Sequence, residues 1–270
     1  EAGVKGGMPV LLLSAGQAGA TSPATLARCV VQSVAEVIAG LVYVNAIQEG
    51  APAIFGTWPF VSDLRTGAMS GGSGEQAVLM AACGQMAQFY NLPSGIAAGM
   101  TDSKIPDAQS GYEKGYTVAL AGHSGANLIY ESAGMHASLL GCCLESYVID
   151  NDMLGAINRT VRGIEVNAET LSLDPIRDVC LDGPGHYLGH EQTLNRMQSD
   201  YLYPIVGDRE NINNWIEQGS TDSIQRAHLK LKEILKTHFP NNWDEDTDRK
   251  IREQFPVRLP RNLMQFPEIS

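Results

Sequence analysis

The residues Gly50-Ala51-Pro52-Ala53-Ile54-Phe55-Gly56-Thr57-Trp58 set a pattern that recurs along the chain. A small residue of the kind that ends helices precedes a proline, which cannot continue a helix but is tolerated at the first residue of a strand. The same order precedes residues 10–15, after Gly7-Met8-Pro9, and residues 94–100, after Asn91-Leu92-Pro93. A fourth apolar run, 126–133, follows Gly125 without a proline. Each boundary predicts the end of a helix and the start of a strand.

Segments whose sequence patterns predict helices separate the four predicted strands. We expect helices over residues 23–48, 74–90, 107–121 and 135–163, the first started by Ser22-Pro23. Strands that are apolar on both faces are typical of a parallel sheet covered by helices. The sequence therefore predicts an α/β protein of the (β/α)8 TIM-barrel type. Four βα units occupy residues 1–165, and a helical C-terminal extension and tail occupy residues 166–270, with an amphipathic helix near 221–238.

Four units do not close an eight-stranded barrel. The chain starts at Glu1, directly before a predicted strand. We therefore expect it to supply the C-terminal half of a barrel whose N-terminal half lies outside this sequence. The alternative is an open sheet that is complete in itself.

Composition excludes several classes of function. The net charge of −11 over 270 residues disfavours binding to phosphate backbones or anionic lipid. No uninterrupted apolar run approaches the ~20 residues of a membrane helix, and no basic segment leads into an apolar one at the start. We expect a cytoplasmic protein without nucleic-acid or membrane partners. The cysteines lack the spacing of metal ligands and are expected to be reduced and largely buried: Cys29, Cys83, Cys142, Cys143 and Cys180.

Parallel sheets bind ligands beyond the carboxyl ends of their strands, which directs attention to four loops. The third loop, 99–107, concentrates Asp102, Lys104 and Asp107 with two hydroxyl groups. In the second loop, Trp58 and Phe60 beside Thr57 predict an aromatic wall for a cationic ligand. The ordinary alternatives are a helix cap for Asp107, a solvated charge for Lys104 and core packing for the two rings.

Other motifs are weaker. Glu131 ends the fourth strand, where a buried carboxylate needs a cation or a proton, and His136 follows it. Residues 71–75 resemble a phosphate loop but lack the Lys-Ser/Thr of a Walker site. His186 and His190 have a spacing that can share zinc, yet no third ligand is evident. We expect no metal site and a structural role for this pair.

Three stretches together resemble the trimethylamine methyltransferase family: Gly99-Met100-Thr101-Asp102-Ser103-Lys104 with the following 106–114, then 125–130, and finally 183–194. The resemblance implies transfer of a methyl group from a methylated amine to Co(I) of a separate corrinoid protein, with no tightly bound cofactor in this chain. Some family members carry pyrrolysine, whose place falls at or near Met100. Its absence implies a quaternary amine such as glycine betaine, proline betaine or carnitine.

The resemblance also implies the roles of the strand-end residues. Catalytic roles are expected for Met100, Asp102, Lys104 and Glu131. Substrate binding is expected for Thr57, Trp58, Phe60, Asp107, Gln109, Tyr112 and His136. A cognate corrinoid protein and a homo-oligomer are the expected partners.

Three alternatives remain at this point. Trimethylamine itself is one alternative substrate. A non-catalytic, ligand-binding member of the same barrel family is the second reading. The third is an aldolase-like lyase, for which Lys104 is the single candidate for a Schiff base.

Overall fold

The structure is a computed structural model that describes residues 1–181, 183–238 and 243–260. Contacts divide the chain into two compact units, Glu1–Ile205 and Val206–Ser270. The boundary expected at residue 165 falls inside the first unit, just after the end of helix α5 (Leu144–Arg162). The first unit contains every predicted strand.

Parallel pairing orders the four predicted strands side by side. β1 (Val10–Ser14) pairs in parallel with β3 (Ala53–Thr57), and β5 (Gly95–Ala97) pairs in parallel with β6 (Leu128–Tyr130). A parallel bridge between Phe55 and Ser94 joins the two pairs. A further parallel pair, β2 (Gln17–Ala18) with β4 (Phe60–Val61), extends the layer beyond β1 and β3. The mixed α/β class is confirmed.

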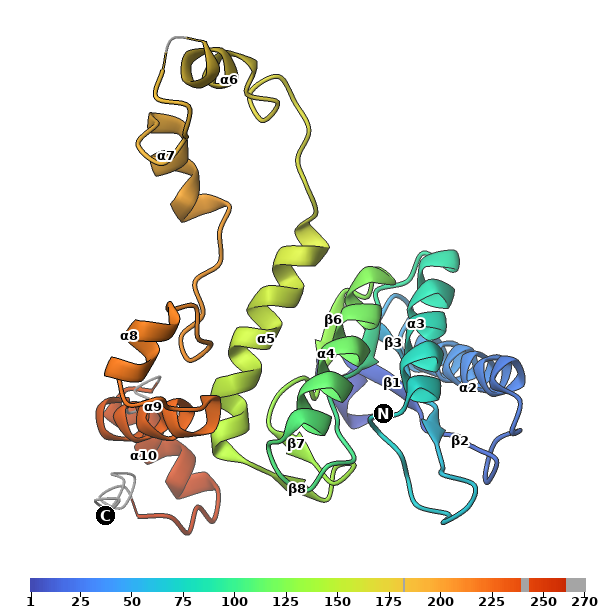
Figure 1. Ribbon diagram of the computed structural model, residues 1–270. Helices are drawn as coiled ribbons and strands as arrows, with labels where there is room; N and C mark the ends of the chain where they lie inside the picture. Colours follow the sequence, from blue (N-terminus) through green and yellow to red (C-terminus); the bar gives the residue numbers. More distant parts are fainter. Residues whose placement is uncertain (182, 239–242, 261–270) are drawn as a thin grey trace. The chain divides into compact units, whose positions relative to one another are not determined.

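The strands do not close a barrel within the described residues, because β1 and β6 each pair on one side only. Helices follow the strands as predicted: α2 (Leu26–Ile47) after β1, α3 (Gly74–Phe89) after β3, α4 (Ala108–His123) after β5 and α5 after β6. Figure 1 shows these strand–helix units in chain order, from blue to yellow-green. A short helix, α1 (Ala2–Lys5), precedes β1.

The core lies between the strands and these helices. One group of buried side chains joins Leu79 and Cys83 of α3 to Ile96 of β5 and Val118 of α4. A second joins Phe55 of β3 to α2. By length and composition alone, α2 is apolar enough to cross a membrane, but such a test is also passed by core helices. One face of α2 packs on β1 and β3, while Val31, Val42 and Tyr43 are exposed.

The segment before α5 corrects one prediction. Residues 135–143 are not helical: they form an antiparallel hairpin of β7 (Met135–His136) and β8 (Gly141–Cys142). Three consecutive residues there, Ala137, Ser138 and Leu139, have positive φ angles between 49° and 79°. That conformation is incompatible with a right-handed helix. The loop hydrogen bonds of this hairpin to residues 101 and 103 compensate for the strain.

Two smaller expectations are also wrong. Helix α2 begins after Thr25 rather than at Pro23, so the proline lies before the helix instead of in its first turn. The cysteines are only partly buried: Cys29 and Cys83 are enclosed, whereas Cys142 and Cys180 are exposed. Cys142 has apolar neighbours in the sequence, but it lies in a surface hairpin, so those neighbours do not bury it.

Helices dominate the chain after α5, as expected. The first unit ends with α6 (Leu173–Cys180) and α7 (Glu191–Ser199). The second unit contains α8 (Ile212–Glu217), α9 (Ser223–Thr237) and α10 (Glu245–Gln254). Helix α9 confirms the predicted amphipathic helix, and a capping box between Asp222 and Gln225 fixes its start.

Candidate active site

Three aromatic rings meet at the carboxyl ends of β3 and β6. The ring centroid of Trp58 lies 4.8 Å from that of Phe60 and 5.6 Å from that of Tyr130, which meets the indole edge-on. Trp58 and Phe60 were expected at this position, whereas Tyr130 was not. Register explains the meeting, because β3 and β6 flank β5 in the parallel array and end at the same edge. We call Trp58, Phe60, Tyr130 and Glu131 the aromatic–carboxylate cluster.

This cluster contains buried polar atoms without hydrogen-bond partners among the described residues. They are Nε1 of Trp58, the hydroxyl oxygen of Tyr130 and Oε2 of Glu131. Burying a polar group without a partner is unfavourable, so such atoms are uncommon in folded proteins and often mark functional sites. Glu131 also has a positive φ of 61°, which is unusual for a residue with a side chain.

Electrostatics of the cluster follow from burial. Burial raises the pKa of the Glu131 carboxyl above its ordinary value. Burial, and then the neighbouring Glu131 carboxylate, raise the pKa of Tyr130. A ligand that carries a positive charge would favour the ionised form of Glu131, and electron-rich ring faces would attract the same charge. The cluster is therefore chemically suited to an organic cation.

Asp102, in the loop after β5, is partly buried and accepts several hydrogen bonds. Its Oδ2 accepts a hydrogen bond of 2.5 Å from Ser70, and its Oδ1 accepts bonds from the backbone N–H of Gly71 at 2.8 Å and of Gly72 at 3.3 Å. Oδ1 also accepts a bond from the Ser138 hydroxyl. One carboxylate thus joins the loop after β5 to the loop before α3 and to the β7–β8 hairpin.

Buried Glu113 fixes the same loop from α4. Its Oε2 accepts bonds from the Thr101 hydroxyl at 2.5 Å and from the backbone N–H of Asp102 at 2.8 Å, while Oε1 accepts one from Gln109 at 2.8 Å. Met100 is fully buried, and its Cβ lies against the backbone of Gly71. The Met100 side chain has no exposed surface in this structure. A catalytic role for Met100 stays a prediction.

Lys104 and Asp107 of that loop lie toward solvent. Lys104 is exposed, and its Nζ donates a bond of 2.7 Å to the backbone oxygen of Asp102. Asp107 caps α4 by accepting a bond of 2.9 Å from the N–H of Ser110, and this bond lowers the pKa of its carboxyl. Tyr112 is exposed and stacks on Tyr116 at 6.3 Å. The alternative reading of Asp107 as a helix cap is confirmed.

Thr57 and His136 are both buried. Thr57 ends β3 beside the thiol of Cys83, whose pKa burial raises to about 12. His136 contacts the Ser146 hydroxyl through Nε2 at 2.7 Å, and burial lowers the pKa of its imidazole. The hydroxyl oxygen of Thr57 and Nδ1 of His136 are also buried without a hydrogen-bond partner among the described residues. Both stay predictions as substrate-binding residues.

Sequence reasoning missed a buried ion pair near the site. Lys114 Nζ lies 2.6 Å from Oδ2 of Asp150, and the two side chains are 1% and 6% exposed. The same oxygen accepts a bond of 2.7 Å from the N–H of Gly134, in the loop that follows Glu131. The signal was available: Ser110, Thr117 and Ala121 form a buried stripe on α4, and helical spacing adds residues 113 and 114 to it.

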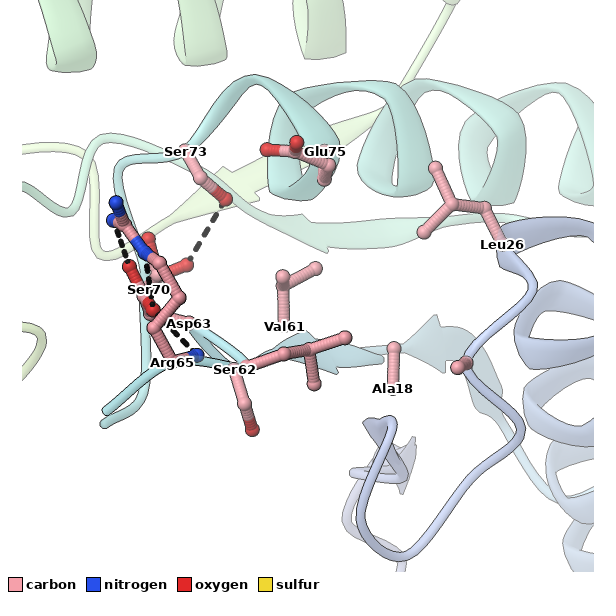
Figure 2. Close-up of a pocket in the computed structure, with 11 residues that line it drawn as sticks. Ala18, Leu26, Val61, Ser62, Asp63, Arg65, Ser70, Ser73 and Glu75 are labelled. Atoms are coloured by element: carbon pink, nitrogen blue, oxygen red, sulfur yellow. Dashed lines mark hydrogen bonds and ion pairs between the residues drawn. The ribbon is translucent and has the colours of Figure 1, made fainter. Parts of the chain in front are cut away.

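A hollow of about 430 Å³ lies next to this region, beside β2, β4 and the start of α3. Figure 2 shows Asp63 paired with Arg65 in its wall, with Ser70 and Ser73 alongside. The Nη2 atom of Arg65 lies 2.6 Å from Oδ2 of Asp63. Hydrogen bonds from Arg65 lower the pKa of the Asp63 carboxyl, and Asp63 in turn raises the pKa of the Arg65 guanidinium, so both groups stay charged. The hollow contains none of the expected site residues, although Ser70 links its wall to Asp102.

Metal-ligand clusters of three or more residues do not occur in the described part of the chain. His190 serves instead as the N-cap of α7, where its Nδ1 accepts a bond of 3.1 Å from the N–H of Gln192. This contact is structural for His190, while the structural role expected for His186 stays a prediction.

Comparison with known proteins identifies the class. Residues 1–259 match the family described as "Trimethylamine methyltransferase (MTTB)", and the chain belongs to that family. It is 32% identical to glycine betaine methyltransferase of Desulfitobacterium hafniense (strain Y51) over 247 residues, 91% of this chain and 51% of that protein. It is 37% identical to trimethylamine methyltransferase MttB of Methanosarcina barkeri (strain Fusaro / DSM 804) over 245 residues, 90% of this chain and 48% of the relative.

A third relative is trimethylamine methyltransferase MttB of Desulfitobacterium hafniense (strain DSM 10664 / DCB-2), 35% identical over 250 residues, 93% of this chain and 50% of that protein. The chain spans about half the length of the curated relatives it matches. The family resemblance of the sequence motifs is therefore confirmed.

Proposed function

We propose that this protein transfers a methyl group from a quaternary amine to Co(I) of a separate corrinoid protein. The observation that carries the proposal is the aromatic–carboxylate cluster at the strand ends, in a chain that belongs to the trimethylamine methyltransferase family. Relatives named for glycine betaine and for trimethylamine support a methylated amine as the donor. We place the substrate's nitrogen against Trp58 and Tyr130, with Glu131 supplying negative charge.

The proposed reaction requires no acid or base catalysis by Trp58, Tyr130 or Glu131. The electron pair of Co(I) attacks a methyl carbon, the carbon–nitrogen bond breaks, and its electron pair stays on nitrogen. A quaternary ammonium then departs as a neutral tertiary amine, so no proton has to be supplied. The work of the chain is to bind the cation and hold one methyl group in line with the incoming cobalt.

The absence of pyrrolysine from the sequence favours a quaternary donor over trimethylamine. A tertiary amine is a poor methyl donor until it is protonated or attached to an electrophile, and this chain lacks the electrophile of the pyrrolysine-containing members. A cluster of rings and a carboxylate is sufficient for a donor that already carries a permanent positive charge.

The roles of the neighbouring residues are revised within this proposal. Asp102 and Glu113 position the loop that contains Met100, because hydrogen bonds occupy both carboxylates. Lys104 is at the loop surface and is suited to contact the corrinoid protein. An aldolase-like reaction is disfavoured, since a Schiff-base lysine needs a desolvated amine and Lys104 is exposed.

We further propose that the strand–helix units form the C-terminal half of a TIM-type barrel. The parallel order of β1, β3, β5 and β6 with intervening helices supports this arrangement. We propose a cytoplasmic homo-oligomer, with the corrinoid supplied by the partner protein rather than bound by this chain.

The test is a substrate panel with the native protein and a corrinoid protein reduced to Co(I). Glycine betaine should give dimethylglycine and methylcobalt in equal amounts, measured by NMR and by absorbance. Trimethylamine should give neither product. Transfer from trimethylamine but not from any quaternary amine would overturn the choice of donor, and no transfer from either would support the non-catalytic alternative.

A further inference from the structure

The indole N–H of Trp58 has no hydrogen-bond acceptor within the aromatic–carboxylate cluster. Its Nε1 is buried and has no acceptor among the described residues. Contacts with Phe60 at 4.8 Å and Tyr130 at 5.6 Å hold the indole in place, so it cannot easily turn to find one. An indole N–H can only donate. Whatever satisfies it must bring an acceptor.

A second donor lies in the same cluster. The Tyr130 hydroxyl is also buried without a partner among the described residues, and its raised pKa keeps it protonated at neutral pH. Glu131 is the opposite kind of group, since its carboxylate attracts a cation and repels an anion. The cluster therefore combines two buried donors without acceptors and one carboxylate oxygen without a donor among the described residues. That pattern matches a ligand with separated negative and positive charges.

We propose that the Trp58 indole N–H determines specificity by binding the carboxylate of a zwitterionic substrate, a betaine, while the ammonium group faces Glu131. This inference rests on the proposed function, because it assigns the acceptor end of the same substrate. The Trp58 N–H and the Tyr130 hydroxyl are both neutral donors, so hydrogen bonds rather than an ion pair would bind the carboxylate. A donor to a charged acceptor contributes about 1.5–3 kcal/mol, which corresponds to roughly tenfold or more in affinity.

The test separates the acceptor contact from the cation contact. Trp58→Phe removes the indole donor and keeps a smaller aromatic face, which can still contact a cation. Calorimetry should show that the Kd of glycine betaine rises about tenfold or more in this variant. The Kd of tetramethylammonium, a cation without a carboxylate, should change less than about twofold. Trp243→Phe, which alters an exposed ring of the second unit, is the matched control and should change neither value.

Three results would overturn the proposal: an unchanged Kd for glycine betaine in Trp58→Phe, an equal loss for both ligands in a folded variant, or no betaine binding by the native protein. If Trp58→Phe does not fold, as judged by circular dichroism, Tyr130→Phe decides instead. It should weaken betaine binding without affecting tetramethylammonium, and equal effects on the two would count against the proposal. Because binding is measured without corrinoid, betaine binding without methyl transfer would refute the proposed reaction and leave this inference standing.

Discussion

Replacing Asp102 by alanine tests whether its carboxylate organises three loops. The change removes the acceptor of two backbone N–H groups, on Gly71 and Gly72, and of the hydroxyls of Ser70 and Ser138. A buried donor left without a partner costs about 1–3 kcal/mol, while a hydroxyl can rotate to another acceptor or to water. Counting mainly the two backbone groups, we expect a loss of about 3 kcal/mol in the free energy of unfolding of the first unit.

Denaturant unfolding followed by circular dichroism measures this loss, and hydrogen exchange locates it. Amide protection should fall in residues 70–73 and 137–139 and stay unchanged in α2. Asp107→Ala is the matched control, since it removes a carboxylate from the same loop that only caps α4, and it should cost about 1 kcal/mol. A loss below about 0.5 kcal/mol in Asp102→Ala, with unchanged exchange, would refute the idea that this residue organises the loops.

Three further predictions concern neighbouring residues. Glu131→Gln should stabilise the protein at about pH 7, because burial raises the pKa of Glu131 in the folded state. The native protein then loses stability as the pH rises from the ordinary carboxyl pKa through the raised pKa, and the variant does not. Unfolding curves at both ends of that window check this, and parallel pH dependences would contradict it. Lys114→Met should cost about 3–5 kcal/mol by leaving Asp150 buried without its cation. Lys114→Met with Asp150→Leu should recover part of this loss but not all, because the N–H of Gly134 then loses its acceptor. A double variant no more stable than the single one would contradict this. Gly99→Ala should destabilise the protein by ~2 kcal/mol or more, because φ is +105° and the added Cβ would lie 2.6 Å from the backbone of Ser132. The control Gly111→Ala, at an exposed position of α4, should stabilise it by up to ~1 kcal/mol. Thermal unfolding compares the two variants, and equal melting temperatures would contradict the prediction.

Most of the correct predictions about the fold came from the positions of prolines and glycines. The Pro9, Pro52 and Pro93 boundaries mark strand starts within two residues, because a helix cannot continue through a proline in its interior. The β7–β8 hairpin could not be predicted in the same way. Its three consecutive positive-φ residues depend on hydrogen bonds to a loop more than thirty residues earlier in the chain, and local sequence does not encode such contacts.

The candidate site was predictable in part for a related reason. Strand ends located Trp58, Phe60 and Glu131, since parallel strands finish at one edge. Asp102 was placed in the right loop but given the wrong environment, because the four groups that bond it come from two other loops. Composition within a loop reports which charges are present, not which partners will bury them.

A crystal structure of the native protein with glycine betaine tests the central claim most directly. We predict the quaternary nitrogen within about 6 Å of the ring centroids of Trp58 and Tyr130, on the side of Glu131, with the substrate carboxylate at the indole N–H. A betaine molecule bound instead in the hollow beside Asp63, or away from the aromatic–carboxylate cluster altogether, would contradict the account.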